Sequence, residues 1–291
     1  MKIDVYLLNS FCIESTGGNP AGVVLNTANF TNPQKKSIAQ ELGFSETAFV
    51  QESDKADFKV TFFTPTEEID LCGHATIATY ALLLKKNIIN PGEYTQELKA
   101  GLLKVRVKND GTIIMGQRLP NFKQILDPAA VADVLKIPTV WIMETHLTPQ
   151  VVSTGLNDLI IPIDTREHLF LIKPNDTGIT DFEKKHGLDS LHIFTLDTVK
   201  ENAIAHSRNF DPLHGIHEES ATGSSTGALA CYLYKSGKTD VNQLHTLVFE
   251  QGYSMKQPSH IVVSLEADKK MLTRVQVGGK AIITGEKEII I

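Results

Sequence analysis

Residues 70–83 read DLCGHATIATYALL, and this stretch decides how the fold is interpreted. Its second half is apolar and uncharged, which predicts a buried helix. Its first half instead brings together Cys72, Gly73 and His74, where a core helix would carry larger aliphatic side chains. A helix N-terminus presents unpaired N–H groups and a partial positive charge, so small residues there let an anionic ligand approach closely. Tight packing of the helix against neighbouring strands is the alternative reason for small residues.

A second stretch, residues 222–237 (TGSSTGALACYLYKSG), has the same character. Aligning Cys72 with Ser224 places Tyr80 opposite Tyr232, and a Phe-x-Pro motif followed by two glutamates precedes each helix. This repeat predicts an α+β fold of two pseudo-repeated domains, each a mixed sheet or barrel wrapped around a central helix. The predicted domains are residues 1–118 and 119–291, with the last strand able to return to the first half. Recurrence in both halves favours the anion site, with the two helix starts gripping one carboxylate.

Short β-like runs dominate the rest of the chain, and alternation is clear in residues 103–108, LKVRVK. Two further helices are predicted at residues 31–42 and 127–136, since each opens with a capping residue followed by proline.

Composition excludes several classes of protein. The 291 residues are 42% hydrophobic and 21% charged, as in soluble globular proteins. A net charge of −6 without a basic stripe argues against nucleic acid as a partner. No apolar run reaches the ~20 residues of a membrane span, and the first residues lack a signal-peptide pattern. Three scattered cysteines form neither a disulfide framework nor a zinc motif. We therefore expect a cytoplasmic protein that contacts no membrane.

Six motifs in order resemble the PhzF-like family of phenazine-biosynthesis isomerases, which shares the two-domain fold of diaminopimelate epimerase. They are GNPAGVVL (18–25), LGFSETAFV (42–50), FFTPTEEIDLCGHATIATYALL (62–83), RNFDPLHGIHEESATGSSTGALACYL (208–233), EQGYSMKQPS (250–259) and VGGKA (277–281). The resemblance implies a cofactor-independent isomerase without a metal, and a homodimer. Its substrate would be a small carboxylate of the type of trans-2,3-dihydro-3-hydroxyanthranilate.

The resemblance also implies catalytic roles for three residues. Glu46 would take a proton from a substrate carbon and return it elsewhere, and burial near Phe44 and Phe49 is expected to raise its pKa. His74 would donate or relay a proton, and its place at a helix start is expected to lower its pKa and keep it neutral. Glu219 would contact a polar substrate group or orient His74.

Seven further residues are expected to bind the substrate carboxylate and backbone, or to lie beside it: Asn19, Ser45, Cys72, Gly73, Gly223, Ser224 and Ser225. Cys72 is expected mainly to pack as a small apolar residue. The related epimerases have cysteine at both positions taken here by Cys72 and Ser224. A serine hydroxyl is too weak an acid to replace a thiol, which argues against two-base epimerisation.

The chain departs from the family pattern at two places. Glu219 and Ser220 stand where the family has Asp-Pro, and Gln257 stands where it has arginine. These changes leave open an alternative reading, a member of the same fold that binds a small anion without turnover.

Another alternative, metal-dependent hydrolysis, rests on LHGIHEES, with His214, His217, Glu218 and Glu219. Its His-x-x-His spacing differs from that of helix-borne zinc enzymes, and its proline and glycine predict a loop.

Overall fold

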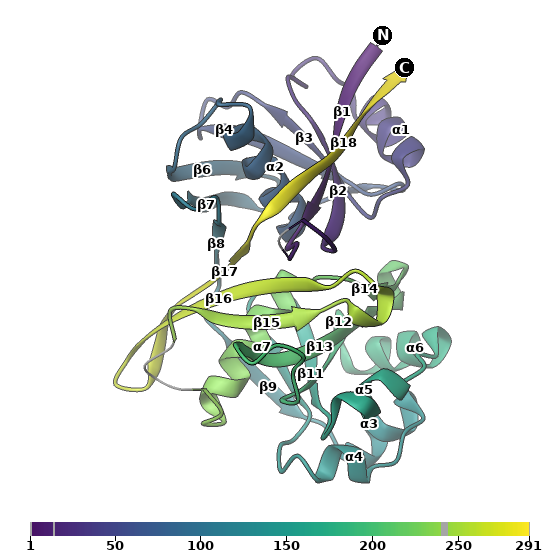
Figure 1. The fold of residues 1–291 in the computed structure, drawn as a ribbon. Coiled ribbons are helices and arrows are strands. Elements are labelled where there is room, and N and C mark those ends of the chain that lie inside the picture. The colour runs from purple at the N-terminus through teal and green to yellow at the C-terminus, as the bar shows by residue number, and fades with distance from the viewer. Residues whose placement is uncertain (1, 14, 240–243, 291) are drawn as a thin grey trace. The chain divides into compact units, whose positions relative to one another are not determined.

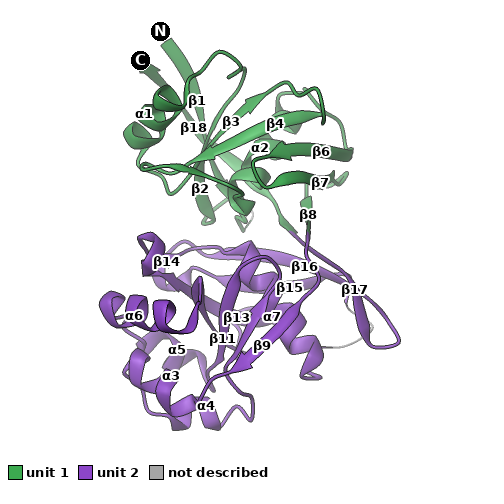
Figure 2. Cartoon of the chain, turned by 180° about the vertical axis from the view of Figure 1, so that it is seen from behind, with its two compact units in different colours: residues 1–116, 278–291 green, residues 117–277 purple. Residues whose placement is uncertain are grey.

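The computed structural model describes residues 2–13, 15–239 and 244–290, and the chain divides into two compact units (Figure 2). Unit 1 consists of residues 1–116 and 278–291, and unit 2 of residues 117–277. The end of the chain therefore packs with the first unit.

Unit 1 is a mixed sheet around one helix. Its elements are β1 (Lys2–Ser10), β2 (Asn19–Val24), α1 (Asn32–Leu42), β3 (Thr47–Gln51), β4 (Phe58–Phe63), β5 (Glu68–Ile69), α2 (Gly73–Lys85), β6 (Gly92–Leu98), β7 (Gly101–Val107), β8 (Ile113–Gln117) and β18 (Ala281–Ile290). β1 pairs antiparallel with both β18 and β2, and β2 runs parallel to β3. β3 pairs antiparallel with β4, which runs parallel to β6.

Unit 2 combines another mixed sheet with more helices. It contains β9 (Asn121–Ile125), α3 (Pro128–Leu135), α4 (Val140–Met143), β10 (Gln150–Ser153), β11 (Asn157–Pro162), α5 (Arg166–Leu171), α6 (Asp176–His186), β12 (Ser190–Thr195), β13 (Ala203–Asp211), β14 (Ile216–Glu219), α7 (Gly223–Lys235), β15 (Leu247–Gln251), β16 (Ser259–Asp268) and β17 (Met271–Gly279), with short 3₁₀ turns at Pro212–His214 and Tyr253–Met255. β11 runs parallel to β12, and β13 to β15.

Helix α2 is the centre of unit 1. It contacts β1, β2, β3 and β18, which lie beside it in Figure 1, and nine of its thirteen residues are buried. Alanines at positions 75 and 78 and the fully buried Leu82 pack with Ala21, Val23 and Val60 from the strands. A helix covered on so many sides needs small residues and has no polar face. This confirms the predicted central helix.

Helix α7 repeats α2, but in a different register from the predicted one. Both helices span thirteen residues from a glycine to a lysine, Gly73–Lys85 and Gly223–Lys235. In both, a first-turn threonine hydroxyl donates to the carbonyl of the residue preceding the helix, from Thr76 to Cys72 (2.7 Å) and from Thr226 to Thr222 (2.8 Å). The helices therefore match 150 residues apart, so the predicted pairing of Cys72 with Ser224 was wrong by two residues. The structural counterpart of Cys72 is Thr222.

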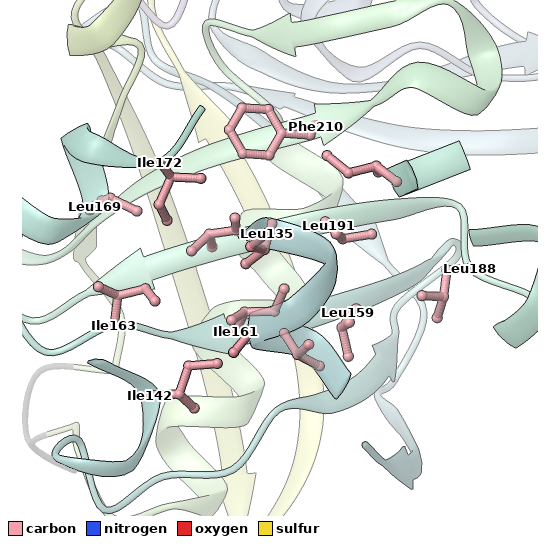
Figure 3. Close-up of a cluster of buried hydrophobic side chains, with 14 of the residues drawn as sticks. Leu135, Ile142, Leu159, Ile161, Ile163, Leu169, Ile172, Leu188, Leu191 and Phe210 are labelled. Carbon is pink, nitrogen blue, oxygen red and sulfur yellow. The ribbon is translucent and has the colours of Figure 1, made fainter. Parts of the chain in front are cut away.

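A separate apolar core in unit 2 holds the helices α3 to α6 on the sheet. Figure 3 shows Leu135 and Ile142 from the helical side facing Leu159, Ile161 and Leu191 of β11 and β12. Helices α1, α2, α3 and α7 were predicted from the sequence, whereas α4, α5 and α6 were not. Among the described residues, no helix is long and apolar enough to cross a membrane.

Candidate active site

Three segments of unit 1 bring acid/base side chains together. Asn19 is the first residue of β2, and Glu46 directly precedes β3. β2 and β3 are parallel neighbours, and the Gly22 amide donates to the Glu46 carbonyl at 3.3 Å. The side chains of Asn19 and Glu46 therefore start from the N-terminal ends of adjacent strands. Helix α2 packs on both strands, and its start supplies Cys72 and His74.

We call Glu46, Cys72 and His74 the acid/base cluster. The Glu46 Oε2 atom lies 3.2 Å from Nε2 of His74, a distance typical of an ion pair, although it has no hydrogen-bond partner of regular geometry among the described residues. The Cys72 Sγ atom lies 3.5 Å from Nδ1 and 4.0 Å from Nε2 of the same ring. All three side chains are buried, with exposed fractions of 8%, 6% and 5%.

Two neighbours hold the histidine in place. The Asn19 side-chain amide lies 3.3 Å from Nδ1 of His74, on the ring edge away from the Glu46 contact. The buried Ser10 hydroxyl at the end of β1 donates to the His74 carbonyl at 2.6 Å, which fixes the first turn of α2. The side chain and the backbone of His74 are therefore anchored by different strands.

The prediction of a raised pKa for Glu46 was wrong. Burial does raise the pKa, but the charge of His74 beside the carboxylate, with hydrogen bonds that include one from Ser45, brings it below its ordinary value of 4.5. The predicted residue Ser45 therefore supports the ionised carboxylate. Glu46 is a carboxylate at neutral pH and can accept a proton.

The prediction of a lowered pKa for His74 was wrong as well. Burial lowers the pKa, yet the electrostatic and hydrogen-bond interactions with Cys72 and with the Glu46 carboxylate outweigh it and hold the pKa well above 6.5. The partial positive charge of the α2 start, on which the prediction relied, is worth at most about 2 kcal/mol, and a carboxylate 3.2 Å away exceeds it. Burial also raises the pKa of the Cys72 thiol. The cluster thus pairs a carboxylate with an imidazolium beside a neutral thiol.

Gly73, the first residue of α2, is not required by packing. A Cβ there would meet only Met115 Cε at 3.5 Å, which is ordinary contact. The glycine leaves the helix start without a side chain, as the predicted anion site requires.

In unit 2, a glutamine braces the loop before α7. Gln251 accepts a hydrogen bond from the Thr222 amide at 3.1 Å and donates to the Glu219 carbonyl at 2.7 Å. The Thr222 hydroxyl donates to Glu219 Oε2 at 2.5 Å. Glu219 is therefore held against the helix start by Thr222. The neighbouring Ser220 is buried, and the side chain of Gln257 is exposed.

The three remaining predicted residues form the first turn of α7. Gly223 and Ser225 are buried, whereas Ser224 is half-buried. The Ser225 hydroxyl donates to Asp158 Oδ1 at 2.8 Å, so this side chain faces the interior of unit 2. The Ser224 carbonyl accepts from the Thr154 hydroxyl at 3.4 Å. Ser224 has the most exposed side chain of the three.

Three supporting residues were not predicted from the sequence: Ser10, Asp158 and Gln251. Gln251 lies in the motif EQGYSMKQPS, which marks the segment as part of the family pattern. The motif does not show that Gln251 braces the loop before α7. Ser10 ends β1 and Asp158 is the second residue of β11, and no recognisable motif surrounds either residue.

The four residues behind the metal-hydrolase alternative do not converge. His214 contacts Asp211 and His217 contacts Asp176, each at 2.7 Å. Glu218 forms a two-point ion pair with Arg208 at 2.9 and 2.8 Å, and Glu219 binds Thr222. Among the described residues, a group of three metal-ligating side chains occurs only at the acid/base cluster. The LHGIHEES loop therefore does not form the metal site that this alternative requires.

The chain combines a sheet-rich α+β fold in two units with a buried contact between Glu46 and His74 at a helix start. The chain matches the model of the phenazine biosynthesis-like protein family over residues 8–287, and it belongs to this family.

Similar proteins are named as isomerases, PhzF-family proteins or epimerases. A protein of Clostridium acetobutylicum named an uncharacterized isomerase is 30% identical, over 100% of this chain and 99% of the relative. The crystal structure of a PhzF-family phenazine biosynthesis protein of Bacillus anthracis has a TM-score of 0.91 and 29% identity, with complete coverage of both chains. A hydroxyproline epimerase of Agrobacterium vitis shares the fold alone, with a TM-score of 0.64 at 11% identity, covering 99% of this chain and 92% of that one. The chain is an isomerase of the PhzF-like family.

Proposed function

We propose that this isomerase moves a proton within a small carboxylate-bearing substrate, of the type of trans-2,3-dihydro-3-hydroxyanthranilate, without a cofactor. The observation that carries the proposal is the buried contact of 3.2 Å between Glu46 Oε2 and His74 Nε2. A carboxylate that is already ionised can take a proton from carbon, and an imidazolium beside it can supply one. The two groups therefore provide a base and an acid within one small volume.

Burial is the reason why such a pair can act on a weakly acidic C–H bond. Glu46 and His74 are shielded from water, so their interaction with the charge that develops on the substrate is stronger than it would be in solvent. The helix start at Gly73 adds backbone N–H groups, which favour a substrate carboxylate nearby. Asn19 would orient His74. Substrate contacts by Glu219, Gly223 and Ser224 stay predictions. A homodimer and a cytoplasmic location stay predictions as well.

Proton NMR in D₂O tests the proposal. The protein is mixed with trans-2,3-dihydro-3-hydroxyanthranilate and with a panel of small amino and hydroxy carboxylates. Deuterium uptake or conversion to an isomer is expected, and Glu46→Gln should slow it by roughly 10²–10⁴-fold, because the amide cannot accept the proton. Glu52→Gln is the matched control, since Glu52 is exposed and follows β3 as Glu46 precedes it.

Turnover of Glu46→Gln within tenfold of the wild type would refute the role of Glu46. Substrate-induced shifts in the protein spectrum, without deuterium exchange on any compound, would favour the alternative of a protein that binds a small anion without turnover. The departures at Glu219, Ser220 and Gln257 make this second outcome worth measuring.

A further inference from the structure

The acid/base cluster has the composition of a transition-metal site. It contains one sulfur, one imidazole nitrogen and one carboxylate oxygen, and its three ligand atoms all lie within 4.8 Å of one another. Sulfur and imidazole ligands select zinc-like ions, whereas magnesium and calcium prefer oxygen alone. We propose that the cluster binds a divalent ion of the zinc class, and that this ion reversibly inhibits the enzyme. The inhibitory part rests on the function proposed above.

The distance between the Glu46 carboxylate and the His74 ring suits tetrahedral coordination, whereas the Cys72 sulfur has to move. Bonds of about 2.0–2.1 Å to nitrogen and oxygen and about 2.3 Å to sulfur place the ligand atoms about 3.3–3.6 Å apart. His74 Nε2 lies 3.2 Å from Glu46 Oε2 and 4.0 Å from Cys72 Sγ. The sulfur lies nearer to Nδ1 (3.5 Å) than to Nε2, so a rotation of the Cys72 side chain towards Nε2 is needed to complete a three-ligand site. The fourth position is left for water or for a substrate oxygen.

Charge also fits a doubly charged ion. A thiolate, a carboxylate and a neutral imidazole around a +2 ion form a neutral complex, which a buried position tolerates better than a net charge. Coordination replaces the thiol proton of Cys72 and the proton on Nε2 of His74, and both protons pass to solvent. Cys72 immediately precedes α2, where the partial positive charge favours the thiolate. The same partial charge opposes the ion itself, by up to about 2 kcal/mol per unit of charge at a buried position.

The surroundings orient the central ligand. When Nε2 binds a metal, Nδ1 of His74 carries the proton and needs an acceptor, and the Asn19 side-chain amide lies 3.3 Å away. Turned so that its oxygen faces the ring, this amide accepts that hydrogen bond. Such a partner fixes the ring and raises its affinity for the metal. Inhibition follows because the ion occupies the Glu46 oxygen that would otherwise accept the substrate proton.

Cobalt(II) titration of the full chain tests binding without reference to activity. Because thiolate coordination to Co²⁺ produces a charge-transfer band in the near ultraviolet, the wild type should develop this band up to one equivalent. Zn²⁺, which binds such ligands more tightly, should abolish the band, and Mg²⁺ should not. Cys72→Ser should lose the band, and Glu46→Gln should weaken cobalt binding at least tenfold. Asn19→Ala should weaken it roughly 10–100-fold.

Cys12→Ser is the matched control, because Cys12 is also a buried free cysteine of unit 1 but is not part of the cluster. It should keep both the band and the activity. Circular dichroism checks that each variant is folded. A band that is absent from the folded wild type, or that depends on Cys12 or Cys231 instead, would overturn the site.

Exchange assays then test inhibition. Zn²⁺ should suppress the Glu46-dependent deuterium exchange, and a chelator should restore it. Full exchange activity at one equivalent of bound metal would overturn the inhibitory role while leaving the site. Cobalt binding by a protein that exchanges no substrate would leave the metal site standing and count against the proposed function.

Discussion

Replacing Asp158 by asparagine should remove the pH dependence of stability that this carboxyl imposes on unit 2. Asp158, on β11, is 1% exposed, and its Oδ1 atom accepts hydrogen bonds from the hydroxyls of Ser190 and Ser225, each at 2.8 Å. Its Oδ2 atom has no hydrogen-bond partner among the described residues. Burial raises the pKa of Asp158 from 3.8 to about 7, although the two hydroxyls favour the charged form. The folded protein therefore holds a proton that the unfolded chain releases.

The magnitude follows from linkage. Because the folded pKa lies above the unfolded one, stability is greatest below pH 3.8 and falls as the pH rises towards 7. One pKa unit corresponds to about 1.4 kcal/mol. Relative to low pH, the Asp158 carboxyl therefore lowers the free energy of unfolding by about 2 kcal/mol at pH 5 and by about 4 kcal/mol above pH 7. Asparagine keeps an acceptor for both serines and has no proton to lose. The difference in free energy of unfolding between Asp158→Asn and the wild type should therefore increase, in favour of the variant, by about 2–3 kcal/mol from pH 5 to pH 9.

Trp141 makes the measurement specific. It is the only tryptophan in the sequence, and it lies in α4 of the same unit as Asp158. Urea unfolding of both proteins, followed by tryptophan fluorescence at several pH values, gives the difference in free energy at each pH. Since all other titrating groups are shared, the difference isolates Asp158. A difference that does not change with pH would refute the reasoning, and would indicate that the positive end of α7 keeps Asp158 ionised.

Two further substitutions test the supports of the loop before α7. Gly252 has φ of +82°, and a Cβ there would lie 2.3 Å from the Gln257 carbonyl and 2.5 Å from that of Ser220, so Gly252→Ala should lower the free energy of unfolding by about 1–3 kcal/mol. Gly43→Ala, at φ of +68° with open space around it, should cost less, and equal losses in urea unfolding would contradict the steric argument. Glu218→Gln should cost about 3–5 kcal/mol, because it breaks the buried pair with Arg208. Glu266→Gln, at an exposed pair with Arg274, should cost at most about 1 kcal/mol, and similar losses for the two would show that burial of the Arg208 pair contributes nothing.

The central helices could be predicted because their composition is unusual. Residues 73–86 and 222–237 are uncharged over most of their length and open with small residues, and the capping residues and prolines placed two more helices. Helix α6 could not be recognised in the same way, since Ile179 is its only buried apolar residue and Gly178 interrupts it. The register of the repeat was misjudged because it relied on matching tyrosines. The shared feature is a threonine-to-carbonyl hydrogen bond in the first turn, formed by Thr76 and Thr226.

Resemblance supplied the members of the acid/base cluster, but not their charges. The pKa values of Glu46 and His74 depend on the 3.2 Å between them, which results from the parallel pairing of β2 with β3 and the packing of α2. Such a distance between residues 28 positions apart in the chain leaves no local pattern in the sequence. A helix start or a burial argument taken alone predicts the opposite direction for each group.

The pairing of β1 with β18 has a consequence for synthesis. Lys2 lies opposite Ile290 and Ser10 opposite Ala281, so unit 2 is an insertion within unit 1 (Figure 1). At about 5–20 residues per second, β1 waits roughly a quarter of a minute to one minute on the ribosome with one edge unpaired. Its exposed Lys2 and Asp4 suit this wait, because charged residues discourage pairing with other chains. The unit that carries the acid/base cluster begins to form before unit 2, so a nascent chain cannot complete this unit until β18 has been made.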